Sequence, residues 1–287
     1  MMKWIASFVL AALCLTACNR PLEEHRFSGG QASKTVTYSN LMDEASRNSV
    51  AQVLQRQGVP QERIHTWLEW VEDLNGRITS PQLPVGFVEM AQDYVDYSQV
   101  RFPLKEGKGG TYMPEPNCRL TAFLLLGDRV SARGERDEND WHLLFDLQAI
   151  DNYQAFAMSP QDKAHYSILF QWVPVAGAAT MEEHTQLIQQ AWRSRDIALQ
   201  GSGLSLVTVY AHSVFEDVRF VTHAGVLAET EEGLLFVERY SPEAPFQATR
   251  FQNRAQLKEY LLARPDLYGE KKELPPIVME NGEPLAA

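Results

Sequence analysis

The sequence predicts an α+β protein in which helices come first along the chain and an antiparallel sheet comes last. Apolar residues recur at helical spacing in the first part, as at Ile64, Trp67 and Val71. Three segments after residue 203 are instead rich in Val, Leu, Phe and Tyr, which is typical of strands. Helices followed by consecutive strands indicate an α+β fold, whereas regular alternation would predict a parallel sheet.

The composition excludes several classes of protein. Of the 287 residues, 45% are hydrophobic and 22% are charged, which fits a folded chain and not a disordered one. Three cysteines are too few for a disulfide framework. A net charge of −11 and the lack of a Lys/Arg-rich block argue against nucleic acid as a partner.

The first 17 residues are predicted to be a signal peptide. Lys3 is followed by an apolar run that ends at residue 17, shorter than the roughly 20 residues needed to span a bilayer. The run ends in Leu-Thr-Ala before Cys18, which resembles the lipobox of bacterial lipoproteins. The resemblance implies that Cys18 is acylated and becomes the first residue of the mature chain. The alternative is a plain secretory peptide that is cleaved nearby.

A lipid on Cys18 would attach the protein to a membrane of the cell envelope. Asn19 is not the aspartate that usually retains lipoproteins at the inner membrane, so in a host with two membranes we expect the outer one. Cys14 would be lost with the signal peptide and Cys18 would carry the lipid. The remaining free thiol is Cys118.

The mature chain is predicted to contain one α+β domain between two flexible ends. Residues 18–38 are polar and are interpreted as a tether, and residues 271–287 as a C-terminal tail. Within the domain, residues 39–105 form a helical part and residues 106–270 the candidate catalytic core. In the helical part, one helix stops at Asn75-Gly76, and a second amphipathic segment runs from Phe87 to Val95.

The core is predicted to begin with a loop rich in glycine and proline, residues 107–116, that leads into a short apolar helix carrying Cys118. We expect a further helix over 140–150, a buried strand over 166–173, and a helix that opens at Thr180 with a capping box. Strands then cover 204–215, 218–227 and 234–240, with a hairpin loop at 229–233. A last helix covers 254–263.

Cys118 and His223 are the candidate nucleophile and base. A cysteine where a loop enters a helix faces unpaired N–H groups and the positive end of the helix dipole, which favour a thiolate. His223 lies on a predicted strand, where Gly225 leaves room for another chain to approach. If the hairpin turn is centred between residues 230 and 231, His223 lies directly opposite Glu238, which would orient the imidazole. A shifted register would place residue 239 or 240 there instead.

Two residues near the cysteine have supporting roles in this hypothesis. Tyr112 lies six residues before Cys118, the separation at which papain-type enzymes place an oxyanion-hole glutamine, so its phenol is a candidate donor to an oxyanion or substrate. Asn117 either caps the helix or orients His223, and we favour the cap. The sequence contains no H-E-x-x-H or H-x-x-E-H motif, and we expect neither a metal nor another cofactor.

A helix that begins with cysteine, followed by a strand reading His-Ala-Gly-Val-Leu and an acidic residue on the next strand, resembles the papain-like superfamily. It is closest to the NlpC-like amidases and peptidases, whose motifs read Asp-Cys-Ser and His-Val-Gly. A longer set of motifs resembles the bacterial lipoprotein family of domain of unknown function 4300. These motifs are Asn117-Cys118-Arg119, Gly203-Leu204-Ser205-Leu206, His223 to Leu227, Gly233 to Arg239, Pro245-Phe246-Gln247 and Met279-Glu280-Asn281.

These observations lead to the hypothesis of an exported, lipid-anchored thiol hydrolase. His223 would take the thiol proton, Cys118 would attack an amide or ester carbonyl, and Glu238 would hold the imidazole. The stem peptides of peptidoglycan are the first substrates to expect, and acyl groups of lipids the second. Two alternatives stay open: Cys118 and His223 are inert structural residues, or a non-catalytic envelope lipoprotein binds a peptide, lipid or protein partner on the same fold.

Overall fold

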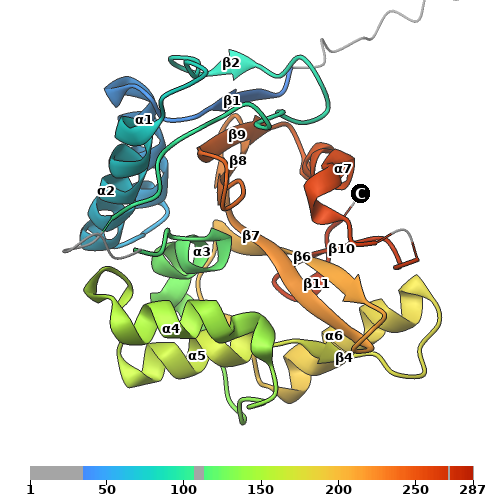
Figure 1. Cartoon of the computed structure of the whole chain (residues 1–287). Helices are drawn as coiled ribbons and strands as arrows, with labels where there is room; N and C mark the ends of the chain where they lie inside the picture. The colour runs from blue at the N-terminus through green and yellow to red at the C-terminus, as the bar shows by residue number, and fades with distance from the viewer. Residues whose placement is uncertain (1–34, 107–112, 271, 287) are drawn as a thin grey trace, which may run out of the picture. The chain divides into compact units, whose positions relative to one another are not determined.

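An antiparallel sheet flanked by helices forms the body of the protein in the computed structural model, which describes residues 35–106, 113–270 and 272–286 (Figure 1). The α+β class predicted from the sequence is confirmed. The helices are α1 Glu44–Arg56, α2 Gln61–Arg77, α3 Cys118–Leu126, α4 Leu144–Asn152, α5 Pro160–Phe170, α6 Met181–Ser194 and α7 Arg254–Ala263. None of the helices in this part of the chain is long and apolar enough to cross a bilayer.

The sheet follows the order β11-β10-β6-β7-β8-β9-β1-β2, and its centre is a meander of consecutive strands. The meander consists of β6 Leu204–Ser213, β7 Val218–Thr230, β8 Gly233–Arg239 and β9 Phe246–Phe251. The outer strands are β1 Thr37–Ser39, β2 Val88–Glu89, β10 Ile277–Glu280 and β11 Glu283–Pro284, and β4 Val173–Pro174 pairs with the start of β7. A separate pair is formed by β3 Val130–Ser131 and β5 Ala198–Leu199.

The sheet extends beyond both predicted ends of the domain. Residues 37 and 38, assigned to the tether, belong to β1, which pairs with β9. Residues 277–284, assigned to the tail, form β10 and β11, and β10 pairs with β6. Each segment is too short to show strand periodicity by itself, and it becomes a strand because an edge of the meander offers it free hydrogen-bonding groups.

Two predicted elements are wrong. The segment from Phe87 to Val95 is not a helix, because residues 88 and 89 pair with β1 as β2 and the rest is irregular. Residues 166–170 form the end of α5 and not a strand, and only the last of the run, Val173, is in β4. An uninterrupted apolar run fits a buried helix as well as a buried strand. Here Ser159 caps the helix and Pro160 starts it, both upstream of the run.

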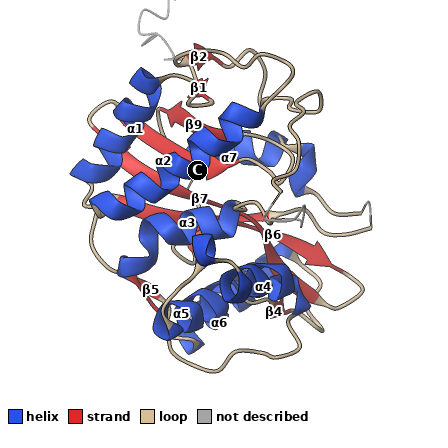
Figure 2. Ribbon diagram, turned by 60° about the vertical axis from the view of Figure 1, so that its left-hand side comes forward, coloured by secondary structure: helices blue, strands red, loops and turns tan. Residues whose placement is uncertain are grey.

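The sheet separates two hydrophobic cores. One core lies against α1, α2 and α3 and takes Ala224, Val226 and Val237 from the central strands. The other lies against α7 and takes Leu227 and Phe236 from the same strands. Alternate residues of one strand therefore face different helices. Figure 2 shows α1, α2 and α3 lying across one face of the sheet. This arrangement lets one strand deliver side chains to two environments.

Candidate active site

Cys118 is the first residue of α3, as the sequence predicts. The side chain of Asn117 caps the helix by accepting a hydrogen bond from the backbone N–H of Leu120 at 2.8 Å. The amide group of Asn117 also donates to Asp146, so both ends of this side chain are used away from His223. Because the first N–H groups of a helix have no partner within it, the backbone N–H of Cys118 can donate to a bound group. The residue as a whole is partly exposed.

His223 reaches Cys118 at a break in the strand pairing. The pairing of β6 with β7 is irregular between Val209 and Tyr210, and Thr222 is the extra residue on β7. The carbonyl oxygen of Thr222 lies 3.9 Å from Cys118 Sγ, at the distance of a weak S–H hydrogen bond. The imidazole of His223 acts on the same thiol and lowers its pKa. Only 2% of its side chain is exposed.

The predicted register of the hairpin is wrong, although the predicted pair meets. Thr230 pairs with Gly233, so the turn consists of residues 231 and 232 and Glu238 lies directly opposite Gly225. Glu238 is thus a diagonal neighbour of His223, two residues out of register and on the same face of the sheet. His223 Nε2 lies 2.7 Å from Glu238 Oε2. This is the geometry of an ion pair and not of a linear hydrogen bond, since the N–H does not point straight at the oxygen.

The space beside Gly225 is filled from within the protein. A Cβ atom on Gly225 would lie 2.3 Å from the ring of Phe236 on β8. The sequence predicts that Gly225 leaves room for another chain. In the structure, that room is taken by an aromatic side chain that packs beside His223 with the ring centroids 6.4 Å apart.

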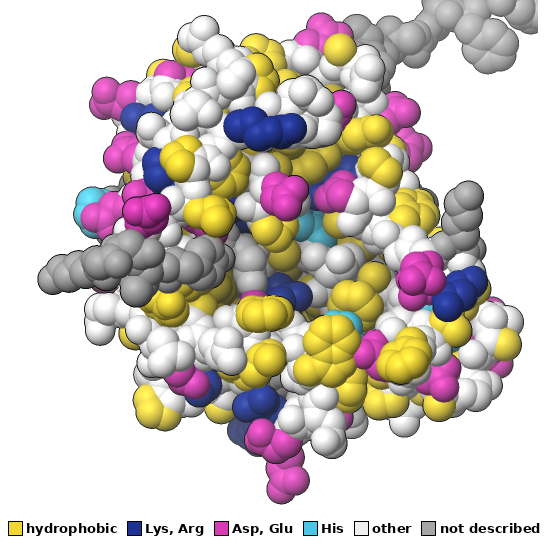
Figure 3. Space-filling view, viewed as in Figure 1, with side chains coloured by type: hydrophobic (Ala, Val, Ile, Leu, Met, Phe, Trp, Pro, Cys, Tyr) yellow, Lys and Arg dark blue, Asp and Glu magenta, His cyan; other side chains and the backbone are white. Residues whose placement is uncertain are grey.

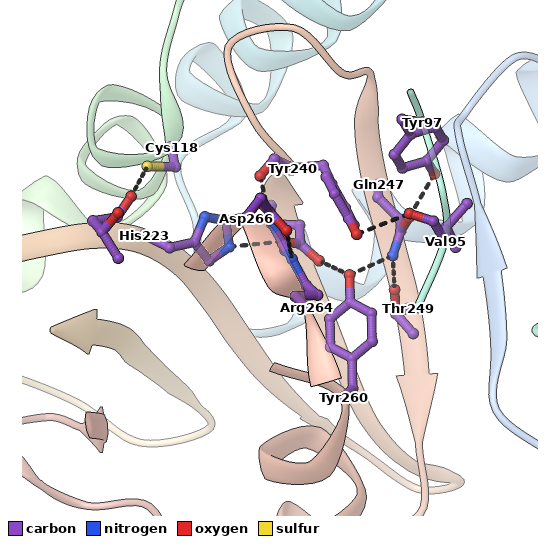
Figure 4. A network of polar contacts seen from close by, with 12 residues as sticks. Val95, Tyr97, Cys118, His223, Tyr240, Gln247, Thr249, Tyr260, Arg264 and Asp266 are labelled. Carbon is purple, nitrogen blue, oxygen red and sulfur yellow. Dashed lines mark hydrogen bonds and ion pairs between the residues drawn. The ribbon is translucent and has the colours of Figure 1, made fainter. Parts of the chain in front are cut away.

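Glu238 is the centre of a buried polar network that sequence reasoning missed. Figure 4 shows His223, Tyr260, Arg264 and Gln247 of this network. The hydroxyl of Tyr260 donates to Glu238 Oε1 at 2.6 Å, and Arg264 Nη1 lies 2.6 Å from Oε2. Gln247 in turn donates to the hydroxyl of Tyr260 at 2.8 Å. Tyr260 and Arg264 are four residues apart, at the end of α7 and just after it, and this helical spacing was the available signal.

Neighbouring groups shift the pKa values of Cys118, His223 and Glu238 in the direction opposite to the effect of burial. Burial raises the pKa of the Cys118 thiol, but the hydrogen bond and charge of His223, the charge of Arg119 and the N–H of Ala224 outweigh it and lower the pKa. Burial and the charge of Arg264 lower the pKa of His223, yet its contacts with Cys118 and Glu238 raise it above its ordinary value. The arrangement therefore favours a thiolate beside an imidazolium.

The pKa of Glu238 completes this pattern. Burial raises the pKa of its carboxyl group, but the charge of Arg264 and the contacts with His223 and Tyr260 lower it below its ordinary value. Glu238 therefore stays ionised while fully buried. An ionised carboxylate on one ring nitrogen of His223 leaves Nδ1 to face the thiol.

Arg119 fixes α3 to the sheet. Its Nη1 donates to the carbonyl oxygen of Val221 at 2.7 Å, and its Nε donates to Asp146 at 2.6 Å. The hydroxyl of Tyr166 also donates to Asp146. This cluster joins α3, α4, α5 and β7 directly behind the thiol, and it explains why a long cation follows the cysteine. Asp146 and Tyr166 carried no signal in the sequence, because their segments are far apart along the chain.

The remaining predicted site residues lie outside the described residues. Tyr112 and Cys18 are both in this group, so the oxyanion and lipidation assignments stay predictions. Within the described ranges, no group of three or more His, Cys, Asp or Glu side chains is arranged to hold a metal ion.

Two cavities lie beside the β7–β8 hairpin turn, far from Cys118. The larger, of about 890 Å³, is lined by Gln57, Glu229 and Arg250 among others, and the smaller is of about 590 Å³. Residue 230 at the turn is seven strand residues from His223, or roughly 23 Å. Figure 3 shows a different feature on the face it views, a recess over β7 in which histidine and Lys/Arg side chains appear among hydrophobic ones.

Comparison with known proteins identifies a family but no characterised relative. Residues 37–285 match the model of a domain of unknown function, DUF4300. No curated protein and no solved structure matches the chain. Because the match covers most of the chain, the protein belongs to the DUF4300 family.

Proposed function

We propose that this member of the DUF4300 family is an exported thiol hydrolase of the papain-like type. The observation that carries the proposal is the placement of His223 between Cys118 and Glu238, with Nε2 2.7 Å from a buried carboxylate. A nucleophile, a base and a group that orients the base are the three roles of a Cys-His-acid site. The lowered pKa of Cys118 and the raised pKa of His223 are the shifts that such a site requires.

In the first half of the proposed reaction, the Cys118 thiolate attacks the carbonyl carbon of an amide. A C–S bond forms, and the carbonyl π electrons move onto the oxygen. The backbone N–H of Cys118, at the positive end of α3, is placed to donate to this oxyanion. The tetrahedral intermediate then collapses. The C–N bond breaks as the proton on His223 Nδ1 passes to the leaving amine, and an acyl-thioester remains on Cys118.

In the second half, His223 acts as the base. Its neutral Nδ1 takes a proton from water, and the water oxygen attacks the thioester carbonyl. The C–S bond breaks, a carboxylic acid leaves, and the proton held by His223 restores the imidazolium beside the thiolate. Glu238 stays ionised throughout, holding the ring and its charge, and Arg264 and Tyr260 hold Glu238.

The expected substrates follow from the predicted location. A signal peptide and lipidated Cys18 would place the domain in the cell envelope, attached to a membrane. Amide bonds in peptidoglycan stem peptides are the first substrates to test, and acyl groups of lipids are the second.

A specific surface feature favours a second candidate, a binding protein without catalysis. Five large apolar side chains are exposed in two segments, Trp141, Leu144 and Phe145 in one and Val214 and Phe215 in the other. Trp141 donates to Glu216, which joins the helical part of this patch to the β6–β7 turn. Exposed apolar patches on soluble domains often mark interaction sites.

Alkylation separates the two candidates. The full chain is treated with iodoacetamide across pH, and modification at Cys118 is measured by peptide mass spectrometry. For the hydrolase, we expect a reaction pKa well below the ordinary value of about 8.5, and we expect His223→Ala to raise it. A reaction pKa near 8.5 in both proteins would favour the binding protein. Digestion of muropeptides, with Cys118→Ser as the control, then tests the substrate.

A further inference from the structure

Arg239 follows Glu238 on β8 but faces the opposite side of the sheet. Successive residues of a strand point to opposite faces, so Glu238 faces α7 and Arg239 faces the side covered by α2 and α3. Arg239 is fully buried, with 0% of its surface exposed. One strand thus delivers a buried anion to one side of the sheet and a buried cation to the other.

The guanidinium group of Arg239 has no counter-ion in the described part of the chain. Its Nη2 donates to the carbonyl oxygen of Pro242 at 3.1 Å, and the group lies 5.1 Å from the ring of Phe246 and 5.7 Å from that of Phe102. Its Nε and Nη1 have no hydrogen-bond partner, and no carboxylate forms an ion pair with it, among the residues that the structure describes. A buried charge without a partner is costly, so its presence calls for an explanation.

The neighbouring charges leave the local sum positive. Arg77 lies 5.9 Å from the same Phe102 ring, and it pairs with Glu115 at 2.8 Å and with Asp73 at 3.0 Å. Asp73 also pairs with Lys105 at 3.0 Å, so these two carboxylates serve three cations, Arg239 included. Glu115 precedes Cys118 by three residues, and α3 packs against β8, so this unbalanced charge lies at the end of α3 that carries the thiol.

We propose that the buried, unpaired cation of Arg239 stabilises negative charge on Cys118. Arg239 acts through the thiol and is therefore a positioning residue. This inference rests on the proposed function, because it assigns to that site a second source of positive potential besides His223. In a buried site, a fixed cation stabilises a thiolate and an oxyanion without the reorganisation that water would need. Arg119 is also close to the thiol, but Asp146 balances its charge.

The protonation of Arg239 agrees with this role. Burial lowers its pKa to about 9, Glu115 and Cys118 oppose the fall, and Arg77 adds to it. The group is therefore still protonated near neutral pH, and Cys118 is one of the anions that keep it so.

Several other charged groups act on the thiol directly or through His223, Arg119 and Arg239, and any test has to keep them in place. They are His223 on β7, Glu238 behind it on β8, Arg264 after α7, Arg119 on α3 itself, Asp146 on α4, and Glu115 and Arg77 before α3. Of these, Arg77 is a further cation near Arg239, and it has Glu115 and Asp73 as partners.

Three variants of the full chain test the proposal through the pH dependence of alkylation at Cys118. For Arg239→Met, we expect the thiol pKa to rise by about 0.5 to 1 unit, so that alkylation below that pKa slows roughly three- to tenfold. Arg239→Lys keeps the charge, and its rate should stay within about twofold of the unchanged protein. Glu115→Gln removes the balancing anion and should shift the thiol pKa downward.

Arg219→Met is the matched control. Arg219 is also fully buried and has no ion-pair partner in the described part of the chain, but it lies at the other end of β7 and contacts His184. Its replacement should leave the thiol pKa unchanged. Opposite shifts for Arg239→Met and Glu115→Gln distinguish a charge effect from a packing defect, which would not change sign.

Two results would overturn the assignment. One is an equal shift in Arg239→Met and Arg219→Met, and the other is a thiol pKa in Glu115→Gln that stays unchanged or rises. If circular dichroism shows that Arg239→Met is unfolded, the thiol pKa values of Glu115→Gln and Arg239→Lys still test the assignment. Failure of the proposed function looks different, because the thiol pKa would then be ordinary and insensitive to His223→Ala.

Discussion

Histidines lie at two places on or beside β7, His184 on α6 with His212 on β6 at one and His223 at the other, and the two places differ in what surrounds them. Near the start of the strand, Arg219 donates to His184 Nδ1 at 2.9 Å, and the backbone N–H of Leu274 donates to His212 Nδ1 at 3.1 Å. Further along the same strand, His223 contacts a thiol and a carboxylate instead. Burial acts on all three imidazoles, but their pKa values shift in different directions.

The pKa values of His184 and His212 fall below the ordinary value, because burial and the charge of Arg219 both disfavour the imidazolium. The pKa of His223 rises despite burial and despite Arg264. The difference is Glu238 and Cys118, two groups that carry or acquire negative charge. Residue type therefore does not distinguish a structural histidine from a candidate base, whereas the charge of its partners does.

The largest expected effect comes from removing the carboxylate. Glu238→Gln leaves His223 buried without its anion and leaves Arg264 with Asp266 alone, and should lower the free energy of unfolding by about 3–5 kcal/mol. Glu216→Gln is the control, because Glu216 lies 3.5 Å from His142 in a partly exposed pair and should cost under about 1 kcal/mol. Urea denaturation measures both. Similar costs would mean that the burial of Glu238 adds nothing.

The next effect concerns the thiol. His223→Ala should slow alkylation of Cys118 near pH 6.5 by about 100-fold, because the thiolate loses its imidazolium partner. His184→Ala should leave this rate within about twofold. An equal loss in the two variants would indicate a general loosening of β7 and would remove the distinction between the two groups.

A smaller effect tests the network behind Glu238. Tyr260→Phe removes one hydrogen bond to the carboxylate and one from the amide of Gln247, which keeps its hydrogen bond to Thr249, so we expect a loss of about 1–3 kcal/mol in the free energy of unfolding. The comparison variant is Tyr268→Phe, whose hydroxyl donates to Leu262 on the exposed surface and should matter little. Thermal or urea denaturation would reveal a stable Tyr260→Phe protein if the network is dispensable.

The smallest expected effect is on the pH dependence of stability, to which His223 and His184 contribute with opposite sign. His223 has a raised folded pKa, so its contribution to stability is complete below its unfolded pKa of about 6.5 and is lost as pH rises through the folded value. His184 has a lowered folded pKa, so its unfolded state binds protons more readily and stability falls as pH drops.

The comparison of wild type with His223→Gln and with His184→Gln across pH 5.5–8 measures this sign, with changes on the order of 1 kcal/mol. Toward low pH, the advantage of wild type over His223→Gln should grow, and its advantage over His184→Gln should shrink. Parallel curves would contradict the contrast between the two groups.

Local signals predicted the elements that carry the site. The helix that begins at Cys118, its Asn117 cap, the capping box at Thr180 and the last helix from 254 to 263 follow from caps and periodicity, and the structure confirms them. The apolar run at 166–173 misled, because a cap seven residues upstream decides between helix and strand. Short edge strands were missed because only the neighbouring strand makes them strands.

The contact between His223 and Glu238 shows both the reach and the limit of such reasoning. Side chains alternate between the faces of a strand, so a register change of two residues keeps His223 and Glu238 on one face. The two residues therefore meet although the predicted turn position is wrong. The exact partner across the ladder depends on where the turn forms. Gly233, with φ of +133°, starts β8 in a backbone conformation that side chains rarely adopt.

The sequence by itself determined the class of the fold, the helix start that exposes Cys118, and the histidine and carboxylate that share a sheet face. These depend on caps, periodicity and residue chemistry, which act over a few residues. Only the tertiary structure decided the clamp of Arg119 on β7, the anchoring of Glu238 by Tyr260 and Arg264, and the unpaired charge of Arg239. Those features join segments that are far apart along the chain, and burial determines their energies, which no local pattern records.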